Sequence, residues 1–155
     1  MSAPRFAVGR LDHVHVHVRD RKAAVAWYRR VLGLAKAYDY TAAGDARGPV
    51  VLTAADGATH LALFEVPEAA IGRAEDRRTV AFSVDGRAFL DFRRRLSRLK
   101  LAGRDGQPVT AAATVDHGNS FSIYFVDPDS NPYEITTYDH KAVKRAVGAK
   151  EARRR

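Results

Sequence analysis

Cysteine is absent from this 155-residue chain, and methionine and tryptophan occur once each. The lack of cysteine excludes disulfide frameworks, thiolate metal sites and cysteine nucleophiles, and it fits a reducing cytoplasm. No apolar run approaches the roughly 18 residues that a membrane-spanning helix needs. The first ten residues also lack the apolar core of a signal peptide. We therefore expect a cytoplasmic protein with no membrane partner.

The net charge of +8 is concentrated near the C-terminal end of the sequence. Residues 141–155 contain seven basic side chains and one acidic side chain, a charge of +6 that leaves +2 on residues 1–140. A nearly neutral body does not offer the basic surface that nucleic acids require. We interpret 141–155 as a solvated basic tail, and we expect its removal to leave fold and ligand binding unchanged.

Hydrophobic periodicity predicts the order of elements in the first half. Histidine and valine alternate strictly over residues 11–18, the pattern of a strand with its histidines on one face. Apolar residues then recur at helical spacing over 20–32, with Asp20 as N-cap and Gly33 as the C-terminal stop. Three short strands follow, near 36–41, 49–54 and 59–66, separated by glycine-containing turns.

The second half repeats this order, with a strand at 79–84, a helix from Asp85 to about Lys100, and further strands. A shift of 66 positions places Val14 on Val80, and a shift of 72 places Leu61 on Tyr133. An internal duplication of this kind predicts two fused half-units. The expected organisation is an N-terminal extension (1–10), two βαβββ modules (11–66 and 79–140), a linker (67–78) and the tail (141–155).

Two stretches carry a resemblance to a known family. Residues 11–34, LDHVHVHVRDRKAAVAWYRRVLGL, resemble the opening strand and helix of the vicinal oxygen chelate superfamily, and 120–135, SFSIYFVDPDSNPYEI, resemble its final hairpin. The residues at 127–131 also predict a turn independently of the resemblance, because Asp127, Asp129 and Asn131 can bond to nearby backbone. The family includes glyoxalases, extradiol dioxygenases, fosfomycin-resistance enzymes and bleomycin-binding proteins. The resemblance implies an α+β fold whose eight strands form an open cup, and a homodimer.

The resemblance also implies a divalent metal, iron, manganese or zinc, in the cup. Carried over by position, the first ligand is His13 and the last is Glu134. The family's second histidine falls on Thr79, and a threonine hydroxyl is a poor replacement for imidazole. His15, two positions along the strand from His13, and His60, on the closing strand of the first module, are the alternatives. We prefer His60, because it approaches the ion from a different strand.

The same resemblance limits the reactions that the site is expected to catalyse. True glyoxalases carry a further carboxylate, the ligand and base, at the position of Ala62, and Glu65 lies on the opposite face of the strand by period two. An extradiol-dioxygenase-like reaction is therefore favoured over glyoxalase activity, with His117 or Tyr124 as proton donor; a lyase or thiol transferase remains open.

A second function class stays open beside the enzyme. A metal-free protein that sequesters a small molecule, such as an antibiotic, would tolerate the loss of the second histidine. The nearly neutral body argues against cationic ligands and leaves anionic or neutral ones.

Overall fold

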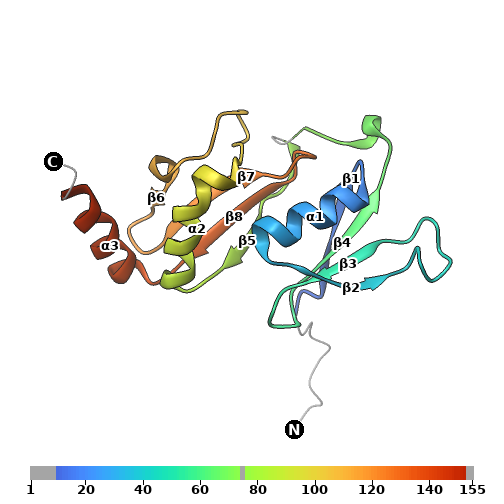
Figure 1. Cartoon of the computed structure of the whole chain (residues 1–155), viewed down its shortest axis with the longest axis horizontal. Helices are drawn as coiled ribbons and strands as arrows, with labels where there is room; N and C mark the ends of the chain where they lie inside the picture. The colour runs from blue at the N-terminus through green and yellow to red at the C-terminus, as the bar shows by residue number, and fades with distance from the viewer. Residues whose placement is uncertain (1–9, 74–75, 153–155) are drawn as a thin grey trace, which may run out of the picture. The chain divides into compact units, whose positions relative to one another are not determined.

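The computed structural model describes residues 10–73 and 76–152 and divides the chain into two compact units, Met1–Ala70 and Ile71–Arg155 (Figure 1). The predicted N-terminal extension lies almost entirely outside the described residues. The division falls inside the predicted linker, where a short 3₁₀ helix, η1, spans Glu68–Ala70. Within the described residues, no helix is long and apolar enough to cross a membrane.

The first unit is a four-stranded sheet with one helix against it. Its elements are β1 (His13–Val18), α1 (Arg21–Leu32), β2 (Ala35–Asp39), β3 (Val50–Thr53) and β4 (His60–Glu65). The strand order is β1-β4-β3-β2, with β1 parallel to β4 and the other pairs antiparallel. This confirms the predicted βαβββ order.

The second unit has the same topology. Its elements are β5 (Val80–Ser83), α2 (Gly86–Leu99), a 3₁₀ turn at Ala111–Ala113, β6 (Val115–Asp116), β7 (Phe121–Val126), β8 (Pro132–Thr137) and α3 (His140–Ala152). The order β5-β8-β7-β6, with β5 parallel to β8, matches the first sheet. The eight strands thus form two four-stranded sheets, and the predicted α+β class is confirmed.

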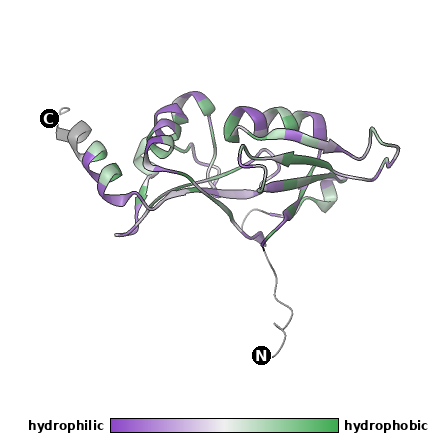
Figure 2. Cartoon of the chain, turned by 90° about the horizontal axis from the view of Figure 1, so that it is seen from below, coloured by the Kyte–Doolittle hydropathy of each residue, from purple (hydrophilic) through white to green (hydrophobic). Residues whose placement is uncertain are grey.

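Local signals place both helices. Asp20 caps α1, its Oδ1 accepting from the Ala23 amide at 2.9 Å, and Gly33 ends it with φ 69°. Asp85 caps α2 in the same way, accepting from the Ala88 amide at 2.7 Å. Hydrophobic and hydrophilic bands alternate along both helices in Figure 2, as the helical spacing predicts. The predicted boundaries agree with the structure to within about one residue.

The strand registers confirm the internal duplication. Val14 pairs with Leu61 in the first sheet, and Val80 pairs with Tyr133 in the second. The two shifts found in the sequence, 66 and 72, therefore map a pair of residues in one sheet onto the equivalent pair in the other. By this equivalence His13 corresponds to Thr79.

The segment interpreted as a solvated tail forms a helix. Most of α3 lies within 141–155, and its Val143 is completely buried. A Cβ added at Gly86 would lie 3.3 Å from Val143 Cγ2, which shows how closely α3 packs against the start of α2. Removal of 141–155 is therefore no longer expected to be neutral, because it would uncover apolar surface of α2.

Val143→Ala is expected to lower the free energy of unfolding. The change removes two methyl groups at about 0.8 kcal/mol each, so we expect a loss of about 1.6 kcal/mol. Urea denaturation followed by circular dichroism measures it. Lys141→Ala, at an exposed position on the same helix, is the control and should change stability by less than about 0.5 kcal/mol. Equal stability of the two variants would show that α3 does not support the fold.

Candidate functional site

The histidine face of the first sheet gathers most of the predicted chemistry of the first unit. Strand register pairs His13 with His60 and His15 with Ala62, so all four side chains project from the same side of the sheet. His13 and His15 are exposed, His60 is half-buried and Ala62 is buried. The opposite side of β1 carries the buried Val16 and Val18. Glu65 pairs with Val18 and thus lies on that opposite side, as predicted.

Asp12 orients two of these imidazoles. Its carboxylate accepts a hydrogen bond from Nδ1 of His13 at 2.8 Å, and its main-chain carbonyl accepts one from Nδ1 of His60 at 3.1 Å. The hydrogen bond from His13 holds the pKa of the Asp12 carboxyl below its usual value. With the proton on Nδ1, Nε2 of each imidazole carries the lone pair that a metal ion would take up, which is how metal-binding histidines are usually held.

His15 contacts His13 at Nε2, the ring nitrogen that Asp12 does not bond. The two Nε2 atoms lie 3.1 Å apart, and the two rings stack with their centroids separated by 5.1 Å. Because Nδ1 of His13 is the donor to Asp12, its Nε2 accepts a hydrogen from His15 Nε2 when both rings are neutral. Two imidazole nitrogens bound to one ion at about 2.0–2.1 Å lie roughly 2.9–3.4 Å apart. The pair therefore has the spacing of a bidentate metal ligand, and binding an ion requires His15 to carry its proton on Nδ1 instead of Nε2.

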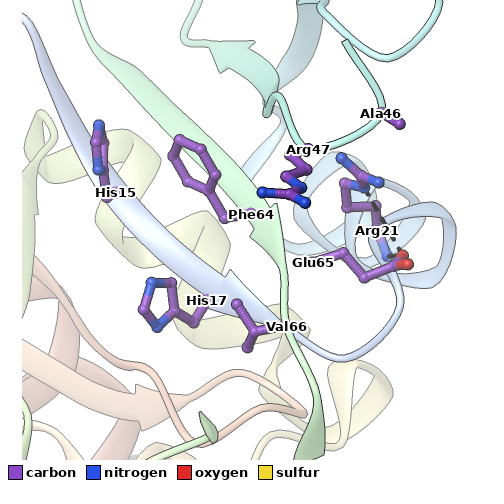
Figure 3. Close-up of a pocket in the computed structure, with 8 residues that line it drawn as sticks. All are labelled: His15, His17, Arg21, Ala46, Arg47, Phe64, Glu65 and Val66. Carbon is purple, nitrogen blue, oxygen red and sulfur yellow. Dashed lines mark hydrogen bonds and ion pairs between the residues drawn. The ribbon is translucent and has the colours of Figure 1, made fainter.

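A pocket of about 490 Å³ continues from this face (Figure 3). The ring of Phe64 lies beside His15, with centroids 4.7 Å apart. Arg21 and Glu65 close the far side of the pocket, where the Arg21 amide donates to Glu65 Oε2 at 3.0 Å. The full lining comprises His15, His17, Arg21, Ala46, Arg47, Phe64, Glu65 and Val66.

The predicted residues of the second unit form a polar cluster within that unit. Glu134 on β8 lies directly opposite Tyr124 on β7. Ser122 donates to Glu134 Oε1 at 2.6 Å, and Nε2 of His117 lies 3.2 Å from the Tyr124 hydroxyl oxygen. Glu134, Tyr124 and His117, predicted from separate arguments, therefore lie next to one another.

Tyr124 is suited to donate a proton. Its side chain is 39% exposed, so a ligand can reach the hydroxyl. Partial burial raises the pKa of Tyr124 above its usual value, the hydrogen bond with Ser122 opposes this, and the charge of Glu134 adds to it. The phenol is thus protonated at neutral pH, with a carboxylate and an imidazole beside it.

Thr79 occupies the position of the family's second histidine and is engaged elsewhere. It is exposed, and its hydroxyl accepts a hydrogen bond from the Arg104 guanidinium at 2.5 Å. A hydroxyl held by a cation is a poor ligand for a divalent ion. Within residues 10–73 and 76–152, no group of three or more histidine or carboxylate side chains forms a metal site.

Sequence reasoning missed Asp12 and Ser122. Asp12 is adjacent to His13 in the sequence, but nothing in the strand alternation marks it as the partner of two imidazoles. Ser122 had a readable signal, since in FSIYFV the polar residues 122 and 124 alternate with buried apolar ones. That alternation puts Ser122 on the face of Tyr124, and the register of β7 with β8 adds Glu134.

Comparison with known proteins gives a consistent result. The model of the Glyoxalase/Bleomycin resistance protein/Dioxygenase superfamily matches residues 10–135. No curated protein matches the sequence. Among solved structures, the fosfomycin resistance protein FosX from Listeria monocytogenes, a variant complexed with Mn(II) and 1S,2S-dihydroxypropylphosphonic acid, is 16% identical with a TM-score of 0.66, covering 84% of this chain and 93% of its own.

Two further structures have similar scores. Lactoylglutathione lyase from Agrobacterium tumefaciens is 22% identical, with a TM-score of 0.60 and coverage of 85% of this chain and 96% of its own. A glyoxalase/dioxygenase from Nostoc punctiforme is also 22% identical, with a TM-score of 0.61 and coverage of 88% and 99%. At these identities the likeness establishes the fold.

Proposed function

Because this chain belongs to the Glyoxalase/Bleomycin resistance protein/Dioxygenase superfamily, we propose that it is a divalent-metal-dependent enzyme acting on a small oxygenated organic molecule. The 3.1 Å approach of the His13 and His15 Nε2 atoms carries the proposal. The Mn(II) in the FosX structure supports a divalent metal in this fold.

On the first sheet the proposed ligands are His13 and His15, and Glu134, carried over from the family pattern as the last ligand, stays a prediction. His13 and His15 have the nitrogen separation of a chelating pair, and Asp12 fixes the tautomer in which His13 Nε2 carries no proton. Glu134 is half-buried and hydrogen-bonded by Ser122, so its carboxylate has a defined orientation. His60, the third ligand preferred from the sequence, stays a prediction, and its Nδ1 bond to Asp12 suits the same role. Two imidazoles and a carboxylate are a donor set that Fe(II), Mn(II) and Zn(II) accept.

The metal would act as a Lewis acid on a substrate oxygen. The chain's own contribution is proton transfer and orientation. Tyr124 Oη holds a proton at neutral pH and can give it to the substrate, and His117 Nε2, 3.2 Å away, can replace that proton from solvent. Ala62, buried between His15 and Val51 in the register, carries no carboxylate base. The proposal is therefore an extradiol-dioxygenase-like reaction rather than glyoxalase isomerisation.

Metal loading tests the proposal. Protein purified without a histidine tag is loaded with Fe(II), Mn(II) or Zn(II), freed of excess ion and analysed for metal. We expect close to one ion per chain in the wild type and a negligible amount in the His13→Ala, Glu134→Ala double variant. His140→Gln, a histidine change outside the proposed ligands, is the control and should load as the wild type does. Negligible metal in the wild type would contradict the proposal and favour the metal-free binding protein.

A further inference from the structure

The pocket beside His15 contains a cation that its surroundings do not neutralise. Three charged side chains line it: Arg21, Arg47 and Glu65. Arg21 and Glu65 neutralise each other, because the Arg21 Nε lies 3.7 Å from Glu65 Oε2 and the Arg21 amide also donates to that oxygen. The guanidinium of Arg47 has no ion-pair partner among the residues that the structure describes. The pocket therefore has one excess positive charge.

The loop that carries Arg47 is held in place on both sides. The Arg47 amide donates to Asp45 Oδ1 at 3.1 Å, and the Gly48 amide donates to the Asp45 carbonyl at 2.9 Å. The Gly48 carbonyl in turn accepts from the Arg21 guanidinium. A Cβ at Gly48 would lie only 2.5 Å from Tyr40 Cβ, so only glycine fits there. The loop backbone is thus fixed before any ligand arrives, which lowers the entropic cost of binding.

Away from Arg47, the pocket is lined by the aromatic rings of Phe64, His15 and His17. Figure 3 shows Arg47 between Phe64 and the Arg21–Glu65 pair, with His15 on the other side of Phe64. Phe64 offers a half-buried aromatic surface, and His17 adds a second imidazole from the same face of β1. A volume of about 490 Å³ is within the range of small-molecule sites.

We infer that the substrate carries an anionic oxygen group, a carboxylate or a phosphonate, which Arg47 binds while an aromatic or apolar body lies against Phe64. The inference rests on the proposed function, because it places the anionic end at Arg47 and the other end toward His15, a proposed metal ligand. A guanidinium recognises both anions through paired N–H donors. The excess charge disfavours cationic molecules.

Binding of simple probes to metal-free protein tests the inference. Benzoate, phenylphosphonate and the neutral benzyl alcohol are titrated into EDTA-treated wild-type protein and followed by calorimetry. We expect at least one of the two anions to bind at least about fivefold more tightly than benzyl alcohol, and raising NaCl from about 50 to 500 mM to reduce that preference. The stronger anion identifies the group. Equal affinity for all three probes would overturn the inference.

Two arginine variants complete the test. Arg47→Ala should weaken binding of the preferred anion about five- to tenfold and leave benzyl alcohol unaffected. Arg98→Ala, which removes the same charge from an exposed position on α2, is the control and should bind as the wild type does. Unchanged anion binding in Arg47→Ala would refute the inference.

The two proposals fail separately. If the wild type and Arg47→Ala load metal equally and neither prefers an anion, the result supports the proposed metal enzyme and contradicts the anion site at Arg47. If anion binding depends on Arg47 but the wild type takes up no metal, the result supports the anion site and contradicts the proposed metal-dependent reaction.

Discussion

Alanine at His13 is expected to weaken metal binding by about 60- to 700-fold. Structural zinc sites with four ligands bind with about 10–16 kcal/mol, or roughly 2.5–4 kcal/mol for each ligand, and a factor of ten corresponds to about 1.4 kcal/mol. The imidazole of His13 is held at both ring nitrogens, by Asp12 at Nδ1 and by His15 at Nε2. Its loss removes a ligand and the partner that positions His15. Competition with a chromophoric chelator measures the affinity.

His15→Ala and His60→Ala, measured in the same way, identify the second imidazole. The 3.1 Å contact leads us to expect a loss for His15→Ala similar to that for His13→Ala, and less than about tenfold for His60→Ala. The reverse order would support the ligand set preferred from the sequence, with His60 acting from the neighbouring strand. His17→Gln, on the same face of β1, is the control and should retain wild-type affinity. A His13→Ala variant with wild-type affinity would rule out both ligand sets.

Asp127→Ala is expected to lower the free energy of unfolding by about 3–5 kcal/mol. The carboxylate is 3% exposed and accepts from the amides of Asp129 at 2.9 Å and Asn131 at 2.8 Å. It also accepts from the Asn131 side-chain amide at 2.8 Å, and Arg77 donates to the other side of that amide. Each buried donor left without a partner costs roughly 1–3 kcal/mol. Total stability of a domain is about 5–15 kcal/mol, so the loss would be severe.

Urea denaturation measures this effect, and two variants separate its causes. Asp127→Asn keeps one acceptor for the backbone but turns an amide group toward the amide of Asn131, so we expect an intermediate loss. Asp105→Ala is the matched control, because Asp105 is exposed and its carboxylate accepts from the Gln107 amide in a surface turn. That change should cost less than about 1 kcal/mol. Asp127→Ala with the stability of Asp105→Ala would show that the buried turn contributes little.

The fold was predictable because its signals are local. The alternation over 13–18, the caps Asp20 and Asp85 and the left-handed Gly33 each determine an element from a few neighbouring residues. The duplication then supplied the topology, since one register implied the other. The interpretation of residues 141–155 as a solvated tail missed a signal that is not local. The burial of Val143 depends on α2, some fifty residues away, and a basic composition does not reveal it.

The candidate site was predictable only in part. Which residues share a face follows from period two, so His13, His15 and His60 could be grouped in advance. Which nitrogen faces which neighbour depends on side-chain rotamers and on a partner such as Asp12, and strand alternation does not encode these. Arg47 shows the same limit, because its role depends on Arg21 and Glu65 pairing with each other across forty-four positions.

The matched registers show that restoring the family's side chains would have a different cost in each half of the chain. The two places where this chain departs from the pattern, Thr79 and Ala62, are counterparts of His13 and Glu134. Thr79 is exposed, so the edge of the sheet would accept an imidazole there at little packing cost. Ala62 is 2% exposed, and a carboxylate there would be buried as a charge. One substitution could therefore restore the missing histidine in the second half, whereas restoring the carboxylate in the first half would bury a charge.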